Sequence, residues 1–258
     1  MITLLTDFGT ADYFVGAVKG AILSVNPKAV IADITHEIPP QDIEAGAFTL
    51  LACYQTFPAG TIHVAVVDPG VGSERRPIVV SANEQFFVGP DNGIFSYICD
   101  REASHRTFHV TAEKYFRPSP SSTFHGRDIF APVAAALSKR VKPEKLGRKI
   151  DDEVRLESID QVTRIIHIDR FGNCITNITP DQLKPGAGLL INGKTIRDFR
   201  KFYGEETGSK PFAIWGSAGF LEISVNGGSA AKVLRIKRGD KVILAQRRKG
   251  AKEDAKNL

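Results

Sequence analysis

The sequence has little cysteine, methionine or tryptophan: three, one and one among 258 residues. Cys53, Cys99 and Cys174 lie far apart, form no CxxC pair and are odd in number. This pattern argues against a zinc ribbon or a disulfide framework and favours a reducing, cytoplasmic compartment. No run of 18 apolar residues is present, so we expect no membrane-spanning helix. The N-terminal segment has an acid where a secretory signal peptide has basic residues, and we interpret it as a buried first strand.

The chain also lacks a strong charge on its body. Its net charge is +5, but residues 247–258 hold five Lys/Arg against two Asp/Glu and therefore contribute three of those charges. A nucleic-acid-binding protein carries its basic residues on a folded face, so we expect a frayed basic tail and no nucleic-acid partner. With 42% hydrophobic and 24% charged residues, the composition excludes a disordered chain, a collagen and a coiled coil.

The first half alternates strand-like and helix-like segments, which predicts an α/β domain at residues 1–155. Its Rossmann-like, mostly parallel sheet should have helices on both faces. The expected strands are Met1–Thr6, Ala29–Ile34 and Thr61–Val67, followed by a hairpin of Pro77–Ala82 and Gln85–Val88 across Asn83-Glu84. The expected helices are Tyr13–Val25, a helix capped by Asp42, and Arg127–Arg140.

The second half has only short strand-like runs separated by Gly, Pro and Asn, which predicts a small antiparallel β-barrel at residues 160–246. The charged stretch Arg148–Glu157 is the expected linker, and 247–258 the tail. The runs are Arg164–Ile168, Cys174–Ile178, Gly188–Ile191, Thr195–Arg197, Phe212–Trp215, Phe220–Val225, Ala231–Ile236 and Lys241–Ala245.

One nucleotide-binding pattern is present but physically unconvincing. Residues 188–195 satisfy GxxxxGK[ST], yet the wildcard positions are mostly large and apolar, and Asn192-Gly193 is the preferred two-residue hairpin turn. We therefore expect strand, turn and strand here rather than a phosphate-binding loop. Nor does the sequence show a metal-ligand cluster, since His36-Glu37 lacks the second histidine of HExxH.

Two loops follow predicted parallel strands, at the sheet edge where α/β proteins bind ligands. Asp7 follows the first strand, and its carboxylate could accept both hydrogen bonds of a ribose diol. The alternative is that Thr10 or Asp12 caps the next helix and Asp7 braces the turn. Asp68 follows the third strand, and Arg75 and Arg76 come within reach of it. The alternative there is a tight turn with a surface ion pair.

A third segment, residues 123–132, places His125 just before a helix, where the positive end of the helix dipole favours the neutral imidazole. Such a histidine is often structural. In the second half, the loops of residues 169–173 and 215–219 combine polar residues with glycine, which suits the mouth of a barrel.

Taken in order, six motifs resemble the S-adenosylmethionine hydrolases, which are relatives of the fluorinase and chlorinase. The motifs are TDFGTxD, VDPGVGxxRR, GPDNG, FHGRDxFAP, DxFGNxxTNI and GSxGFLEIxxNxGxA, running from residue 6 to residue 230. The resemblance implies that water or hydroxide attacks C5′ of S-adenosylmethionine, giving adenosine and methionine. It also implies a homotrimer whose sites lie between subunits, with no cofactor and no metal.

The resemblance also implies roles for particular residues. Asp68, Arg75 and His125 would form the catalytic set: Asp68 and His125 would accept hydrogen bonds from the attacking water, and Arg75 would hold Asp68. Six further residues would bind substrate. Asp7 would bind the ribose, Asp169 the methionine amino group, Asn173 the adenine edge and Ser217 the methionine carboxylate, with Glu222 and the backbone at Val225 on the adenosine side.

Two alternatives are carried forward. The first is a halogenase, which must desolvate a halide with hydroxyl donors. The family's halide-contacting serine and threonine fall on Gly126 and Val71, neither of which has a hydroxyl, so the resemblance favours water. The second is a non-catalytic adenosine or S-adenosylmethionine sensor. It would use Asp7, Asn173 and Ser217 equally well but would not need Asp68, Arg75 and His125 together.

Overall fold

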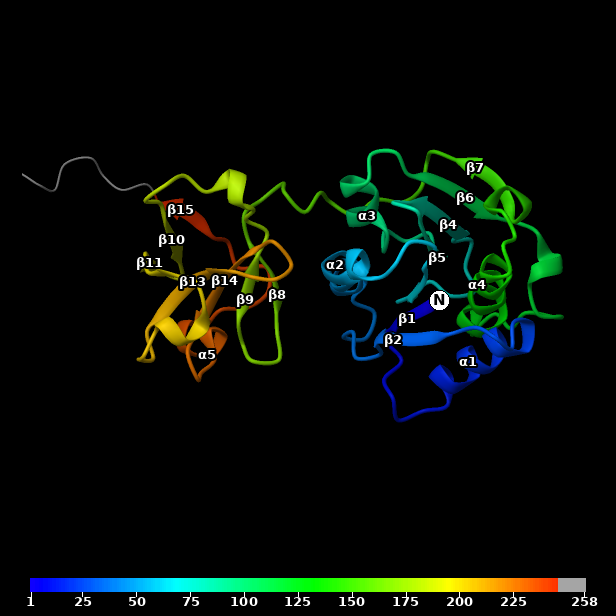
Figure 1. Ribbon diagram of the computed structural model, residues 1–258, viewed down its shortest axis with the longest axis horizontal. Coiled ribbons are helices and arrows are strands. Elements are labelled where there is room, and N and C mark those ends of the chain that lie inside the picture. The colour runs from blue at the N-terminus through cyan, green and yellow to red at the C-terminus, as the bar shows by residue number, and fades with distance from the viewer. Residues whose placement is uncertain (246–258) are drawn as a thin grey trace, which may run out of the picture. The chain divides into compact units, whose positions relative to one another are not determined.

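The chain consists of two compact units, Met1–Ser158 and Ile159 onward. The computed structural model describes residues 1–245, so the tail expected at 247–258 lies outside the described residues. The division falls in the gap between the domains expected at 1–155 and 160–246. Figure 1 shows the elements of both units.

The first unit is built on one seven-stranded sheet with the order β2-β1-β3-β5-β4-β6-β7. Strands β2, β1, β3 and β5 pair in parallel, and β4, β6 and β7 continue the sheet with antiparallel pairings. The strands are β1 (Ile2–Thr6), β2 (Ile31–Thr35), β3 (Ile62–Val66), β4 (Pro77–Ala82), β5 (Gln85–Pro90), β6 (Arg106–Val110) and β7 (Gly147–Ile150).

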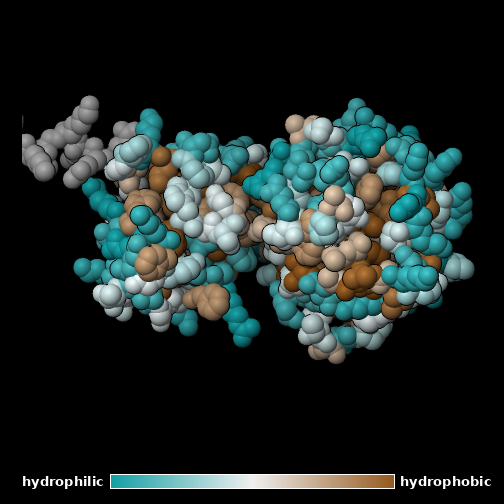
Figure 2. All heavy atoms as spheres, in the orientation of Figure 1, coloured by the Kyte–Doolittle hydropathy of each residue, from teal (hydrophilic) through white to brown (hydrophobic). Residues whose placement is uncertain are grey.

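Helices cover both faces of this sheet, as the sequence predicts (Figure 1). The helices are α1 (Phe14–Val25), α2 (Ile43–Cys53), α3 (Ser96–Arg101) and α4 (Ala131–Ser138). Alternate residues of the strands face opposite ways, so Ile2 and Leu4 of β1 join one apolar core with α1 and α4. On the other face, Gly46 of α2 lies against Val67. In Figure 2, hydrophilic side chains rim the unit, and apolar ones lie at the middle of its visible face.

Local sequence explains most of these elements. Asp42 caps α2 by accepting a hydrogen bond from the Ala45 amide at 3.0 Å. The turn between β4 and β5 places Asn83 and Glu84 at φ of 48° and 56°, as the predicted two-residue hairpin requires. Helix α1 has no side-chain cap at its start, so the alternative of a Thr10 or Asp12 cap is wrong.

Two expectations for the first unit need correction. The helix expected from Arg127 begins with a π-helical turn, Gly126–Phe130, and becomes α-helical only at Ala131. The linker expected at Arg148–Glu157 begins within the sheet, because Arg148–Ile150 belongs to β7 and pairs with β6. Arg148 and Lys149 are exposed on an edge strand, and exposed charged residues are typical of edge strands as well as of linkers.

The second unit has two sheets rather than the closed barrel expected at 160–246. Over the described residues, five strands pair in the order β12-β13-β14-β9-β8 and three in the order β11-β10-β15. The pairing is antiparallel except between β12 and β13. The elements are β8 (Ile165–Ile168), β9 (Cys174–Thr176), β10 (Gly188–Ile191), β11 (Lys194–Ile196), β12 (Phe199–Arg200), β13 (Pro211–Trp215), β14 (Leu221–Val225), α5 (Ala230–Leu234) and β15 (Ile243–Ala245).

One predicted strand of this unit is wrong. The run Ala231–Ile236 forms helix α5 instead, because Ser229 caps the helix by accepting from the Lys232 amide and places Ala230 and Leu234 in the core. The expected hairpin at residues 188–195 is confirmed: β10 and β11 pair antiparallel, with Asn192 and Gly193 at φ of 48° and 73°. The GxxxxGKT letters therefore form a β-hairpin. No helix over residues 1–245 is long and apolar enough to cross a membrane.

Candidate active site

A pocket of about 450 Å³ opens in the first unit, where strands β1 and β3 end. Asp7 follows β1, Asp68 follows β3, and His125 precedes the π-helical turn; all three line the pocket. Parallel strands bring their carboxyl ends to one edge of the sheet, which is why residues more than sixty positions apart meet here. The sequence predicted each of these three residues as a site residue.

Arg75 joins Asp68 and His125 into one cluster. Its Nε donates to both carboxylate oxygens of Asp68 at 3.0 Å, and its Nη2 also donates to Oδ2. The same Nη2 lies 2.8 Å from Nδ1 of His125. The side chains of Asp68 and Arg75 are 5% and 8% exposed, so this is a buried ion pair and not the surface pair that was the alternative. The three predicted catalytic residues are therefore brought together.

The contact with Arg75 sets the state of the imidazole. A guanidinium only donates hydrogen bonds, so Nδ1 of His125 must accept, and the proton of the neutral ring resides on Nε2. Burial, together with the positive charge of Arg75, lowers the pKa of His125 below its usual 6.5. Neutral His125 thus presents an N–H donor at its free nitrogen. The expectation that His125 accepts a hydrogen bond from the attacking water stays a prediction, and the geometry of the ring favours a donor at Nε2 instead.

The loops that carry Asp68 and His125 are in close contact at Gly72. Gly72 has a φ of +77°, and a β-carbon there would collide with the carbonyl oxygen of Ser122. A glycine is therefore required both by the backbone conformation and by the neighbouring loop. The contact joins the loop that carries Asp68 and Arg75 to the segment that leads into His125.

Asp7 lines the pocket and also binds a neighbouring loop. Its Oδ2 accepts a hydrogen bond from the Gln41 amide at 2.8 Å, so it braces the loop before α2, whereas the alternative had it brace its own turn. A carboxylate has about four acceptor positions, and one backbone donor leaves the others for a ligand. The aromatic rings of Phe8, Phe14 and Phe124 line the same pocket, with centroids 5.3–5.9 Å apart.

The second arginine of the RR pair has a structural partner rather than a place in the pocket. Nε of Arg76 donates to Asp91 at 2.7 Å, and its other nitrogens bind the side chain and carbonyl of Asp152 at 2.8 Å. Asp91 belongs to the GPDNG motif and also accepts from the Val154 amide. This motif therefore ties β5 to the segment after β7.

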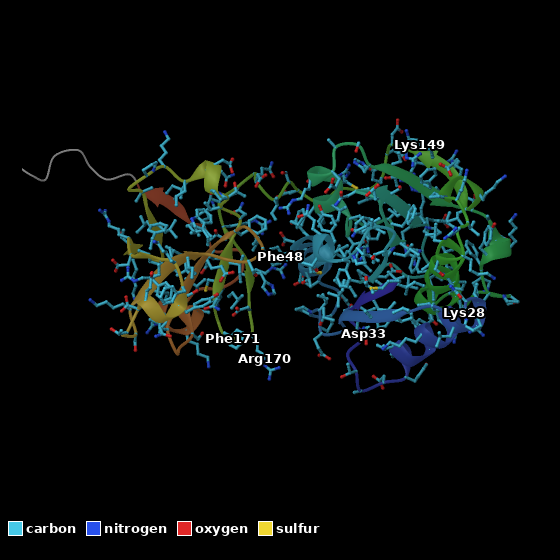
Figure 3. The ribbon with its side chains drawn as sticks, viewed as in Figure 1. Lys28, Asp33, Phe48, Lys149, Arg170 and Phe171 are labelled. Atoms are coloured by element: carbon cyan, nitrogen blue, oxygen red, sulfur yellow. The ribbon has the colours of Figure 1, made fainter. Side chains whose placement is uncertain are left out.

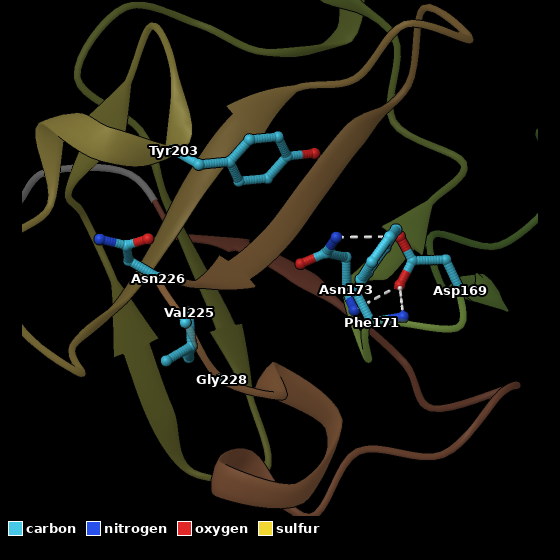
Figure 4. A pocket seen from close by; sticks show the side chains of 8 residues that line it. Asp169, Phe171, Asn173, Tyr203, Val225, Asn226 and Gly228 are labelled. Atoms are coloured by element: carbon cyan, nitrogen blue, oxygen red, sulfur yellow. Dashed lines mark hydrogen bonds between the residues drawn. The ribbon is translucent and has the colours of Figure 1, made fainter.

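A second pocket, of about 620 Å³, lies in the second unit (Figure 4). Asp169 accepts from the amides of Phe171 and Asn173 at 2.9 and 2.8 Å, and from Nδ2 of Asn173 at 2.9 Å. The side-chain amide of Asn173 keeps its oxygen and one N–H for a ligand. Arg170 and Phe171 project from the loop between β8 and β9, and Phe171 is 76% exposed (Figure 3).

Glu222 lies buried beside this pocket, and its partner is a residue that sequence reasoning missed. The Tyr203 hydroxyl donates to Glu222 at 3.0 Å, and Tyr203 and Val225 line the pocket (Figure 4). Burial raises the pKa of Glu222, as does the negative charge of Asp169, and the hydrogen bond from Tyr203 opposes them. Tyr203 begins the short 3₁₀ turn Tyr203–Glu205 between β12 and β13, which carries no motif, so no sequence signal pointed to it.

Two predicted site residues, Arg75 and Glu222, line neither pocket but are bonded to residues that do. Ser217 also lines neither pocket. It lies exposed in the tight turn between β13 and β14, where the Gly219 amide donates to the Gly216 carbonyl at 3.0 Å. Asn226 lines the second pocket without having been predicted. Its signal was present in the last motif, where an asparagine follows the strand.

A metal site was not expected, and residues 1–245 hold one cluster of suitable ligands, Cys99, His105 and Glu153. The Arg155 guanidinium lies within this cluster, 2.8 Å from Glu153 and 3.2 Å from Nε2 of His105. Burial raises the pKa of the Cys99 thiol to about 12. A bound cation there would compete with Arg155, so the cluster is an ion-pair network.

The two units define an α/β-plus-β protein with a polar pocket in each unit. The chain belongs to the S-adenosylmethionine hydroxide adenosyltransferase family: the model of the family's N-terminal domain matches residues 2–147, and that of its C-terminal domain matches residues 163–243. The resemblance drawn from the six motifs is thereby confirmed.

Individual relatives agree with this membership. The chain is 40% identical to the (R)-S-adenosyl-L-methionine hydrolase of Methanocaldococcus jannaschii, over 94% of each chain. It superposes on the crystal structure of an uncharacterized conserved protein from Thermotoga maritima with a TM-score of 0.88 at 33% identity, covering 95% of this chain and 100% of that one. The fluorinase of Nocardia brasiliensis is more distant, at 26% identity over 93% of this chain and 94% of its own.

Proposed function

We propose that this protein hydrolyses S-adenosyl-L-methionine to adenosine and L-methionine. The observation that carries the proposal is the buried Asp68–Arg75–His125 cluster, set in a pocket at the carboxyl ends of β1 and β3. Family membership and the hydrolase relatives at 34–40% identity support it. A pocket built only for binding would not need three mutually bonded polar groups beside the ligand.

The reaction is a displacement at carbon. The oxygen of water forms a bond to C5′, the C5′–S bond breaks, and its electron pair returns to sulfur to give the neutral thioether of methionine. The leaving group needs no proton, so the protein's task is to place and activate the water. As the C5′–O bond forms, the water gives one proton to the carboxylate of Asp68, which passes it on to solvent.

Asp68 and His125 would hold the water from opposite sides. Arg75 makes one contact with Oδ1 of Asp68 and two with Oδ2, which leaves a lone pair on Oδ1 to accept a hydrogen bond from the water. His125, with its proton on Nε2, donates to the water oxygen and fixes a lone pair toward C5′. Arg75 holds Asp68 in place through their ion pair and stabilises the hydroxide character that develops in the transition state.

The remaining predicted residues would bind the ends of the substrate. Asp7 takes the ribose diol, while the second unit supplies Asn173 at the adenine edge and Asp169 at the methionine amino group. Glu222 and Val225 lie on the adenosine side, and Ser217 takes the carboxylate. We propose that the complete site forms in a homotrimer, between the first unit of one subunit and the second unit of the next.

The proposal includes a cytoplasmic setting, which the three free cysteines favour. We do not propose a halogenase activity, because Val71 and Gly126, which line the first pocket, have no hydroxyl group to donate to a halide. A β-carbon at Gly126 would lie 3.4 Å from the ring of Phe124 and 3.5 Å from that of Phe8, so the surroundings of this position are apolar.

Product analysis tests the proposal. The purified chain, incubated with S-adenosylmethionine in H₂¹⁸O, should release methionine and adenosine with ¹⁸O at the 5′ position. Chlorodeoxyadenosine formed in molar chloride would instead identify a halogenase. Tight adenosine binding without any turnover would identify a sensor.

A further inference from the structure

A threonine–histidine pair ties the substrate loop after β1 to the end of β2. Oγ1 of Thr6 lies 2.8 Å from Nδ1 of His36, and both side chains are buried. The Thr6 oxygen also accepts the Phe8 amide at 3.3 Å. Thr6 and Phe8 flank Asp7, so this single hydroxyl holds the residues on both sides of the proposed ribose-binding carboxylate.

The direction of these hydrogen bonds follows from the far side of the ring. Nε2 of His36 lies 3.2 Å from Oδ1 of Asp33, close but without a well-aligned hydrogen bond. Asp33, on β2 (Figure 3), is ion-paired with Lys19 at 2.6 Å and is therefore a carboxylate. A carboxylate beside Nε2 favours the proton there. Nδ1 then accepts from the Thr6 hydroxyl, whose oxygen is free to accept from Phe8.

We propose that Thr6 and His36 are positioning residues for the nucleoside. Their hydrogen bond holds the loop in the orientation in which Asp7 accepts the ribose and Phe8 covers the nucleoside ring. This inference rests on the proposed role of Asp7. The backbone reinforces the same loop, since the Gly9 amide donates to the His36 carbonyl at 2.8 Å. That backbone bond holds the loop at Gly9, whereas the side-chain pair holds it at Thr6 and Phe8, on either side of Asp7.

The chain offers a matched control on the same strand. Thr3 of β1 pairs with His63 of β3 through the same atoms, Oγ1 and Nδ1, at 2.7 Å, and both residues are fully buried. That pair is anchored by Gln85, whose carbonyl lies 3.3 Å from Nε2 of His63. Neither Thr3 nor His63 lines the pocket or bonds to the loop after β1. Removing either threonine hydroxyl therefore leaves a similar defect in the core, but only one of the two defects touches the site.

The experiment compares Thr6→Val and His36→Leu with Thr3→Val in the full-length protein. Adenosine Kd, KM and kcat for S-adenosylmethionine, and Tm are measured for each. Thr6→Val and His36→Leu should each raise Kd and KM about fivefold or more and leave kcat within about twofold, because Asp7 grips ground state and transition state alike. Thr3→Val should lower Tm by a similar amount and leave Kd unchanged.

Conservative variants and the double variant sharpen the test. Thr6→Ser and His36→Asn, which retain a hydroxyl and an acceptor, should recover most of the affinity, and Thr6→Val/His36→Leu should bind no worse than the weaker single variant. Amide exchange at residues 6–9 should accelerate in Thr6→Val but not in Thr3→Val, whether or not the protein turns over.

Three results would overturn the inference. One is a folded Thr6→Val variant with native Kd, and another is a Thr3→Val variant that loses as much affinity as Thr6→Val. The third is an Asp7→Ala variant with native affinity, which would remove Asp7 from the proposed function as well. If Asp7→Ala weakens binding and Thr6→Val does not, only the positioning role fails.

Discussion

Arg75 directs one guanidinium nitrogen at Nδ1 of His125, at 2.8 Å, and thereby fixes which nitrogen of the imidazole carries the proton. The free Nε2 of His125 is therefore a donor. In the proposed reaction, Asp68 would accept a hydrogen bond from the water, His125 would donate one, and Arg75 would supply charge to both.

The first prediction concerns this division. Asp68→Asn and His125→Ala should each lower kcat by about 10²–10⁴-fold while changing substrate affinity much less, because the water gains negative charge only on the way to the transition state. His125→Gln, which can restore an N–H near Nε2, should recover part of the rate. Single-turnover assays at saturating substrate measure the chemical step. Native rates in both Asp68→Asn and His125→Ala would show that these residues only shape the pocket.

The second prediction is that Asp7→Ala weakens adenosine binding by about 1.5–3 kcal/mol, the cost of losing a charged acceptor for two hydroxyls. Titration calorimetry with adenosine measures it. Gln41 loses a backbone partner in this variant, so Tm is recorded alongside. A native dissociation constant would exclude Asp7 from the ribose site.

The third prediction tests whether the first pocket of one subunit and the second pocket of the next combine into one active site. Asp68→Asn and Asn173→Ala subunits, each inactive alone, should regain activity when co-expressed as mixed oligomers. With equal mixing, about one quarter of the sites would combine two native halves, as expected for a symmetric ring of head-to-tail interfaces. Sedimentation fixes the oligomeric state of the mixture. Mixed oligomers that stay inactive would place both halves of the site within one chain.

The fourth prediction separates backbone strain from loop contact. Gly72→Ala and Gly60→Ala both put an alanine at positive φ, +77° and +80°, and each should cost about 1–3 kcal/mol of stability. Gly60 has open space around it, whereas a β-carbon at Gly72 would push against Ser122 and part the loops of Asp68 and His125. Only Gly72→Ala should therefore lower kcat. Equal rates in the two variants would mean that this contact does not position the cluster.

The fifth prediction concerns pH and folding. Burial lowers the pKa of His63 from 6.5 to about 4. The unfolded chain therefore binds a proton at His63 near pH 6.5, while the folded chain stays neutral there until about pH 4. Stability is full above pH 6.5 and should fall by about 3 kcal/mol as the pH drops toward 4. Urea unfolding at several pH values measures this slope, which should be shallower in His63→Asn. Identical slopes would assign the loss to other groups.

Much of the fold was predictable because periodicity reports burial directly. The fully buried β1 and β3 and the Asn83-Glu84 turn carry their structure in a few adjacent residues. Ala231–Ile236 was wrongly predicted as a strand because a short apolar run is compatible with a strand and with a helix. The residue that favours the helix, the cap Ser229, lies outside the run. Closure of a barrel depends on pairings between distant strands, which a run of residues does not encode.

The candidate site also has features that the sequence predicts and features that it does not. Asp7, Asp68 and His125 were identifiable because they stand at strand ends and helix starts. The tautomer of His125 was not, since it depends on Arg75, fifty residues away. Tyr203 also escaped notice, because its only distinction is the long-range hydrogen bond to Glu222.

The pairing of Asp68 with Arg75 also has a consequence for the turnover cycle. Because Arg75 cancels the charge of Asp68 and His125 is neutral, Asp7 leaves the first pocket with an excess of about one negative charge. The proposed substrate is a sulfonium cation, which this excess attracts, and adenosine is uncharged. Hydrolysis would thus abolish the long-range attraction that brought the substrate in, so that the chemical step itself weakens the hold on the product and favours its departure.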